Sequence, residues 1–147
     1  MNEIVDGDRT SDPAYRRDRG IEAYARIFDV PEKDMPAAMA RRVGQVFAEE
    51  VFLAAGGPAW FHPALTDRER SMLIIAALAA QGVAGERLDR HVRLAQRHGL
   101  DYETLTAMMT LVTNYIGQAR GSQAMEAVQR VAGNGEVRHS SGNEVPL

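Results

Sequence analysis

The residue best placed to do chemistry in this 147-residue chain is His91. It shares one face of a predicted helix with three apolar residues at helical spacing, which are Leu88, Val92 and Ala95. Burial on such a face disfavours the charged imidazolium, whereas a nearby carboxylate would favour it, so the ring can be poised for general acid–base catalysis near neutral pH. A histidine on an apolar face can instead be a hydrogen-bonded core residue, and the pattern leaves both interpretations open.

Arg70 is a candidate for holding a carboxylate, because it opens a helix whose remaining surface is nearly all apolar. A guanidinium can bind a carboxylate through two parallel hydrogen bonds. The alternative is a solvated first-turn residue that pairs with Asp67 or Glu69. His62, in an aromatic loop beside Trp60, could line a pocket.

The composition excludes several classes of site and partner. The chain has no cysteine, so it can form no disulfide, thiolate zinc site, iron–sulfur cluster or cysteine nucleophile. Its four histidines include no HxxxH or HxH pair, so we expect no metal site. A net charge of −3 gives no electrostatic reason to expect nucleic acid. The longest apolar run, residues 72–80, is about half of the roughly 18 residues that a membrane span needs, so we expect a cytoplasmic protein with no membrane partner.

Helical periodicity dominates the chain, and no window alternates with period two. Four of the expected helices cover 13–29, 36–55, 86–98 and 119–132. A fifth starts at a capping box formed by Thr66 and Glu69, and a sixth starts at the N-cap Asp101 and ends at Gly117. Six helices with short connections predict an all-α fold, a six-helix bundle. The polar, glycine-containing ends, 1–12 and 133–147, predict flexible arms on a single domain over 13–132.

Several residues are assigned structural roles from the pattern. The helix that follows Thr66 is apolar nearly all round, which is typical of a helix at the centre of a protein or in a subunit interface. Met108, Met109 and Met125 are predicted to fill the core. His98 ends its helix, where a cation complements the helix dipole.

Five segments, in order along the chain, are similar to motifs of one known family. Residues 66–80, TDRERSMLIIAALAA, are similar to a T-x-[K/R]-x-R-S-L-x-x-I-A-A-L helix. Residues 88–100 are similar to L-x-x-H-x-x-x-A-x-x-x-G-[VL], and residues 114–119 to a Y-x-G-x-P-x-A turn. Residues 17–20 and 60–65 are similar to R-Y-x-R-G and W-x-R-P-G-L. On these motifs the chain resembles the gamma-carboxymuconolactone decarboxylases, a branch of the alkylhydroperoxidase D-like superfamily.

The resemblance implies an all-α homo-oligomer, a trimer or a hexamer, that decarboxylates a small carboxylated lactone in aromatic degradation. It implies no metal or cofactor, because the lactone ring itself takes up the electrons left behind by CO2. It makes His91 the proton donor, with Glu86 orienting the ring. It makes Arg70 and Arg19 the groups that hold carboxylates. The remaining substrate-binding candidates from the matched motifs are Trp60, His62 and Tyr115.

Departures from the motifs limit what the resemblance implies. The peroxidase branch carries a C-x-x-C before the matching histidine, but Ala84 and Arg87 stand at those positions, so thiol peroxidase chemistry is absent. His62 stands where the family has an arginine, and Gln118 where it has a proline. The alternatives are therefore an isomerase or another enzyme acting on a lactone or unsaturated acid, and a non-catalytic helical oligomer that binds a small ligand.

Overall fold

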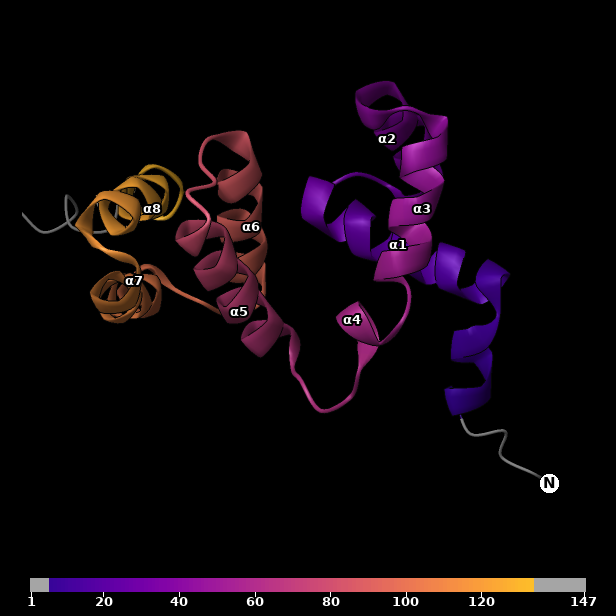
Figure 1. The fold of residues 1–147 in the computed structure, drawn as a ribbon, viewed down its shortest axis with the longest axis horizontal. Coiled ribbons are helices and arrows are strands. Elements are labelled where there is room, and N and C mark those ends of the chain that lie inside the picture. Colours follow the sequence, from indigo (N-terminus) through magenta and orange to yellow (C-terminus); the bar gives the residue numbers. More distant parts are fainter. Residues whose placement is uncertain (1–5, 134–147) are drawn as a thin grey trace, which may run out of the picture. The chain divides into compact units, whose positions relative to one another are not determined.

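The computed structural model describes residues 6–133. Within that range the chain is entirely helical, with eight α-helices, two short 3-10 helices and no strand (Figure 1). The predicted all-α class is therefore confirmed. The chain divides into two compact units, Met1–Leu65 and Thr66–Leu147. Most of the predicted C-terminal arm, residues 134–147, lies outside the described residues, as do residues 1–5.

The first unit begins with a short 3-10 helix inside the segment that the sequence predicts as an arm. Its described elements are η1 (Asp6–Ser11), α1 (Pro13–Phe28), η2 (Glu32–Asp34), α2 (Met35–Val43), α3 (Gln45–Ala55) and α4 (Pro58–Phe61). The helix α1 begins where predicted, because Pro13 suits the first turn and the Asp12 carboxylate accepts a hydrogen bond from the Ala14 amide.

The helix predicted over 36–55 is instead two helices, α2 and α3. Gly44 separates them with a φ of +85°, outside the helical region, and glycine is a weak helix former. Near the break, Val46 and Phe47 are exposed although Phe52 is buried, so the apolar residues of this stretch do not share one buried face. The short helix α4 occupies part of the stretch predicted as a loop, so the described helices outnumber the six expected.

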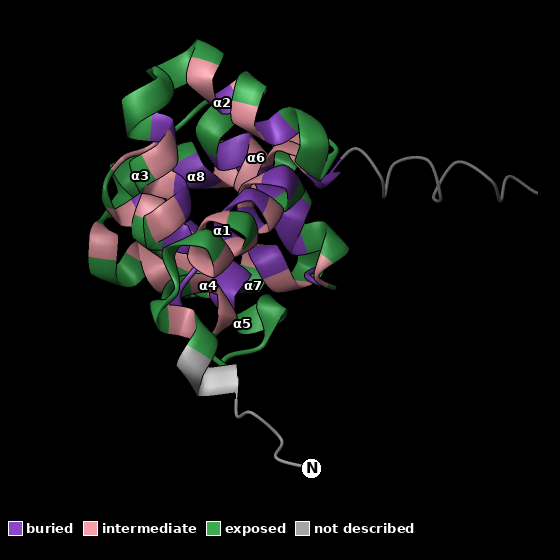
Figure 2. Ribbon diagram, turned by 90° about the vertical axis from the view of Figure 1, so that its right-hand side faces the viewer, coloured by how far each residue is buried: buried purple, intermediate pink, exposed green. Residues whose placement is uncertain are grey.

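Within the first unit, α1 and α3 pack backbone against backbone. A methyl group at Gly20 would collide with the carbonyl oxygen of Phe52, and one at Gly56 would collide with the carbonyl oxygen of Arg16. Both contacts therefore require glycine. The buried side chains of Met35 and Phe52 contribute to the core beside them, and buried and exposed residues alternate along the helices in Figure 2.

Over its described residues, 66–133, the second unit is a four-helix arrangement with well-defined helix ends. Its helices are α5 (Asp67–Ala80), α6 (Glu86–Arg97), α7 (Tyr102–Ile116) and α8 (Gln118–Val131). The predicted capping box is confirmed, because the Thr66 hydroxyl accepts from the Glu69 amide while the Glu69 carboxylate accepts from the Thr66 amide. Asp101 caps α7 through the Thr104 amide, and Gly117, with a φ of +90°, ends it as predicted.

The core of the second unit is formed by side chains from all four helices, including Ile75, Leu88, Leu105 and Val128. The helix α5 turns Ile75 and Ala79 inward, whereas its Leu73 side chain is exposed. The other helices of the second unit therefore do not bury the whole apolar surface of α5. Among residues 6–133, no helix is both long enough and apolar enough to cross a membrane.

Two hydrogen bonds fix the register of α5 against α6, which lie side by side in Figure 1. The Ser71 hydroxyl lies 2.8 Å from the His98 Nδ1 atom, and the Arg68 guanidinium donates to the Gly99 carbonyl at 2.6 Å. Both contacts join the start of α5 to the end of α6, so the two helices run antiparallel. His98, predicted only to complement the helix dipole, also joins the two helices.

Candidate functional site

His91 lies on the inner face of α6. Leu88, Val92 and Ala95, which share that face, are all buried, and the His91 side chain is half-buried. Among the described residues, the structure records no hydrogen bond or ion pair to the His91 ring.

The surroundings of His91 favour its neutral form. Burial lowers the pKa of the imidazole below its ordinary value, and the positive charge of Arg90 lowers it further. At neutral pH the free protein thus presents an uncharged imidazole that can accept or donate a hydrogen bond.

The acidic residues that flank His91 have other partners. Glu86 forms an ion pair with Arg90, one turn further along α6. Asp89 accepts two hydrogen bonds from Arg130 of α8, at 2.6 and 3.2 Å. The structure records no hydrogen bond or ion pair between Glu86 and His91 among the described residues. The two are five positions apart in a helix, so they point in different directions.

Arg70 is buried at the start of α5, with 8% of its surface exposed. Its guanidinium donates to the Asp67 carboxylate at 2.9 Å, so it has the predicted pairing without the predicted solvation. The neighbouring Ser71 bonds to His98, which is seven residues after His91 on α6. At about 1.5 Å of rise per residue, Arg70 and His91 start from levels about 12 Å apart along the antiparallel helix pair.

The first unit contains its own cluster of predicted residues. The Arg19 guanidinium carbon lies 3.6 Å from the centre of the Phe61 ring, and its Nη1 atom donates to Glu22. The Nε atom of Arg19 is buried with no hydrogen-bond partner among the described residues. Trp60, next to Phe61 on α4, is half-buried. His62 is exposed, and its Nδ1 atom accepts from the Ala64 amide, so this ring stabilises a turn.

The predicted site residues belong to both units. The first unit holds Arg19, Trp60 and His62, and the second holds Arg70, Glu86, His91 and Tyr115. Tyr115 lies near the end of α7 and is 84% exposed. Within the second unit, the structure thus places a buried cation and a half-buried imidazole on adjacent antiparallel helices.

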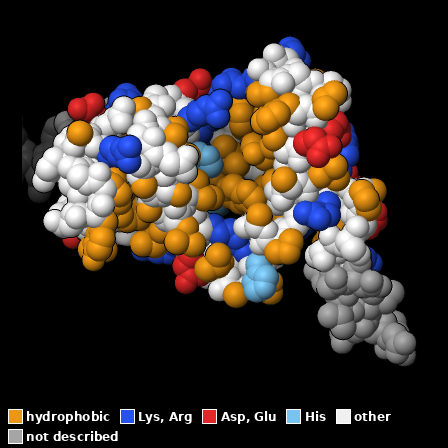
Figure 3. Space-filling model, viewed as in Figure 1, with side chains coloured by type: hydrophobic (Ala, Val, Ile, Leu, Met, Phe, Trp, Pro, Cys, Tyr) orange, Lys and Arg blue, Asp and Glu red, His pale blue; other side chains and the backbone are white. Residues whose placement is uncertain are grey.

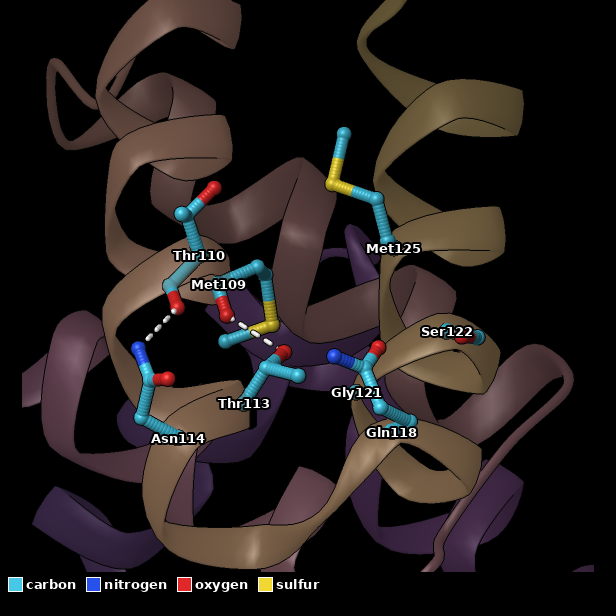
Figure 4. Close-up of a pocket in the computed structure, with 8 residues that line it drawn as sticks. All are labelled: Met109, Thr110, Thr113, Asn114, Gln118, Gly121, Ser122 and Met125. Carbon is cyan, nitrogen blue, oxygen red and sulfur yellow. Dashed lines mark hydrogen bonds between the residues drawn. The ribbon is translucent and has the colours of Figure 1, made fainter.

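A pocket between α7 and α8 was missed by the sequence analysis. It measures about 330 Å³, and Figure 4 shows Met109 and Thr113 of α7 facing Gly121 and Met125 of α8. A side chain at Gly121 would collide with Thr113, so glycine sets the close approach of these helices. Met109 and Met125, predicted as core filler, therefore also line an open pocket.

The walls of this pocket are polar but uncharged. The Asn114 amide donates to the Thr110 carbonyl oxygen. Gln118 and Ser122 are exposed, and the structure records no hydrogen bond from their side chains within the described range. Because no charged side chain lines it, the pocket offers a carboxylate no ion pair. The signal available in the sequence was a run without charges, residues 104–119.

No cluster of three or more potential metal ligands occurs among residues 6–133.

The model of the carboxymuconolactone decarboxylase family matches residues 47–130, more than half of the chain. That span contains His62, Arg70, Glu86 and His91, whereas Arg19 precedes it. No curated protein and no solved structure matches the chain. On the family match, the chain belongs to the carboxymuconolactone decarboxylase family.

Proposed function

We propose that this chain is a cofactor-independent decarboxylase of the 4-carboxymuconolactone decarboxylase type, acting on a small carboxylated lactone or a related acid. The observation that supports this best is the half-buried His91 ring, which lies on an apolar helix face with no recorded hydrogen bond among the described residues. Its lowered pKa leaves the ring uncharged until an anionic substrate arrives. As the resemblance implies, the protein would act as a homo-oligomer.

In this mechanism the substrate itself promotes protonation of the His91 imidazole. A carboxylate that approaches His91 favours the imidazolium and so raises its pKa again. The bond between the ring carbon and the carboxylate then breaks, CO2 leaves, and the electron pair spreads through the conjugated lactone onto its oxygen. The imidazolium delivers one proton to carbon, which restores the neutral imidazole and leaves an enol-lactone.

Arg70 is the proposed carboxylate holder in the second unit. Its guanidinium is buried and already binds one carboxylate, that of Asp67, which is itself half-exposed. A substrate carboxylate could share or replace that contact. Because Arg70 and His91 start from levels about 12 Å apart, their side chains must lean toward each other for one small substrate to reach both.

An isomerase is the second candidate, and the state of His62 favours it. Where the family motif has a permanently charged arginine, His62 is exposed and accepts a hydrogen bond from the Ala64 amide. A substrate with fewer carboxylates needs fewer cations to hold it. Proton removal and return by His91 would then move a double bond without loss of CO2.

Turnover of 4-carboxymuconolactone, followed by CO2 release and by the lactone product, tests the proposal. We expect His91→Ala to lose at least about 100-fold in kcat, the usual contribution of a general acid. Arg93→Ala, an exposed arginine two residues later on α6, is the matched control and should retain activity. Equal rates for the wild type and His91→Ala would remove His91 from the mechanism. A rearranged lactone without CO2 would favour the isomerase, and binding without turnover would favour a non-catalytic binder.

The pH dependence sharpens the same test. The profile of kcat/KM reports the free protein, in which the pKa of His91 lies below its ordinary value. The profile of kcat reports the complex, in which the substrate carboxylate raises it. We expect the pKa in the kcat profile to exceed the pKa in the kcat/KM profile. Identical profiles would contradict the proposal that the substrate carboxylate raises the pKa of His91.

A further inference from the structure

The pocket between α7 and α8 is separate from the residues of the proposed reaction. The residues that line it include neither His91 nor Arg70. Its α7 wall comes from the run without charges, residues 104–119, and in Figure 3 hydrophobic side chains gather at the part of the surface where Figure 1 places α7. A volume of about 330 Å³ is at the small end of the range for ligand pockets, so the pocket has room for one small molecule.

The lining of the pocket divides into a buried floor and an exposed rim (Figure 4). Met109 and Gly121 at the floor are buried, and Met125 beside them is half-buried. The four rim residues are exposed and polar, and they are Thr110, Asn114, Gln118 and Ser122. A ligand that fits this pocket is therefore apolar at its inner end and polar at its outer end.

The α7 wall offers mainly hydrogen-bond acceptors. The Thr110 hydroxyl donates to the Thr106 carbonyl oxygen at 2.8 Å. The Thr113 hydroxyl donates to the Met109 carbonyl oxygen at 2.7 Å. Because each hydroxyl has a single proton, both oxygens are left to accept a further hydrogen bond. The Oδ1 atom of Asn114 is also an acceptor, and the structure records no hydrogen bond to it among the described residues. A polar group that reaches this wall therefore binds best as a donor.

The lining favours an uncharged aromatic ligand. An anion would face acceptor oxygens without a cation, and a cation would lose water without gaining a carboxylate, because no charged side chain lines the pocket. The thioethers of Met109 and Met125 make favourable contacts with aromatic rings. Gln118 and Ser122, whose side chains have no recorded hydrogen bond in the described part of the chain, can donate to a hydroxyl oxygen at the rim. A neutral phenol has both the ring and the hydroxyl that these groups select.

We propose that the α7–α8 pocket is a binding site for a neutral phenol. The ring lies against the thioethers of Met109 and Met125, and the phenol hydroxyl donates to the Thr113 oxygen, which is half-buried between floor and rim. Binding is reversible and forms no covalent bond. The site uses no residue of the proposed decarboxylase reaction, so it stands or falls independently of His91.

Methionine methyl NMR of the full chain tests the site with phenol itself as the probe. The chain has seven methionines, and Met109→Leu and Met125→Leu identify the two signals from the pocket. We expect phenol to shift these two signals in a saturable manner. The signals of Met35 and Met39, which are buried in the first unit, should stay in place and serve as the control. If phenol shifts the pocket signals no more than those of Met35 and Met39, the proposal is overturned.

Two analogues of phenol test the chemistry of the site in the wild-type chain. Anisole keeps the ring and the oxygen but has no O–H to donate, so it should bind roughly fivefold more weakly, the effect of one hydrogen bond. Benzoate keeps the ring but carries a negative charge, so it should give no saturable shift of the Met109 and Met125 signals. Binding of either analogue as tightly as phenol would overturn the proposal.

A pair of tryptophan variants on α8 tests the location of the site. Ser122→Trp places a large side chain at the rim of the pocket and should abolish the shifts that phenol causes. Gln123→Trp changes the next exposed residue, which does not line the pocket, and should retain them. Circular dichroism shows whether each variant keeps its helices. Unchanged phenol binding by a folded Ser122→Trp would overturn the proposal, and the analogue series decides it in the wild type if this variant does not fold.

Discussion

The two units of this chain hold their helices together in different ways. In the first, α1 and α3 approach so closely that Gly20 and Gly56 face main-chain atoms. In the second, large side chains such as Leu105 and Ile75 fill the space between helices. Both units thus have a core of buried side chains, but a glycine of the first unit meets main-chain atoms of a neighbouring helix, whereas Gly121 of the second meets a side chain. The two kinds of packing predict different sensitivities to substitution.

The largest expected effect follows from adding one methyl group in the first unit. Gly20→Ala places a Cβ against the Phe52 carbonyl oxygen, which is part of a helix and cannot rotate away. We expect the free energy of unfolding to fall by at least about 4 kcal/mol, above the usual range for overpacking. Urea unfolding followed by circular dichroism measures it. In the second unit, the three atoms nearest to a Cβ added at Gly121 belong to the Thr113 side chain and lie 2.1–2.8 Å away, so Gly121→Ala should also lower the free energy of unfolding by forcing α7 and α8 apart.

The next effect comes from removing atoms in the second unit. Leu105 is fully buried, and Leu105→Ala should lower the free energy of unfolding by about 3 kcal/mol through lost burial and a cavity. Leu73→Ala on α5 is the control, since that side chain is exposed and should change stability by less than about 0.5 kcal/mol. A large effect of Leu73→Ala in a monomeric variant would show that α5 is covered within the chain.

A smaller effect tests the helix start of the second unit. Thr66→Ala removes the hydroxyl that accepts from the Glu69 amide and should cost about 1 kcal/mol. Thr66→Ser keeps an acceptor and should restore most of the stability. Thermal unfolding of the wild type and both variants checks this. If Thr66→Ala melts at the same temperature as the wild type, the capping box does not contribute to stability here.

The smallest expected effect is a pH-dependent contribution of His91 to the free energy of unfolding. Its pKa in the folded protein lies below the ordinary value of about 6.5 that the unfolded chain has. As pH falls through that value, the unfolded chain binds the proton first, so the wild type loses stability. Between about pH 7.5 and about pH 5.5, the wild type should lose more of its free energy of unfolding than His91→Gln does. A wild type that gains stability relative to His91→Gln would contradict the direction of this shift.

The sequence predicted features that depend on neighbouring residues and missed those that depend on distant ones. The capping box at Thr66, the cap at Asp101 and the break at Gly117 were predicted because their signals are local. The break at Gly44 was missed because the apolar spacing on either side continues through it.

The surroundings of the candidate site were less predictable, since partners from other helices decide them. The apolar face around His91 was predicted from the helical spacing of its residues. The pairing of Asp89 with Arg130, 41 positions later in the chain, could not be predicted in this way. The pocket between α7 and α8 was missed for the same reason, because it depends on Gly121 meeting Thr113. That Glu86 orients the His91 ring stays a prediction.

The two-pronged contact between Asp89 and Arg130 has a mechanical consequence for His91. Two parallel hydrogen bonds resist rolling of α6 about its own axis, and Asp89 is only two residues before the imidazole. Asp89 and His91 point to opposite sides of α6, so we expect Arg130 to restrain the orientation of the ring through Asp89. We expect Arg130→Ala to keep the fold while shifting the NMR signals of the His91 ring. An unchanged spectrum would mean that core packing alone orients α6.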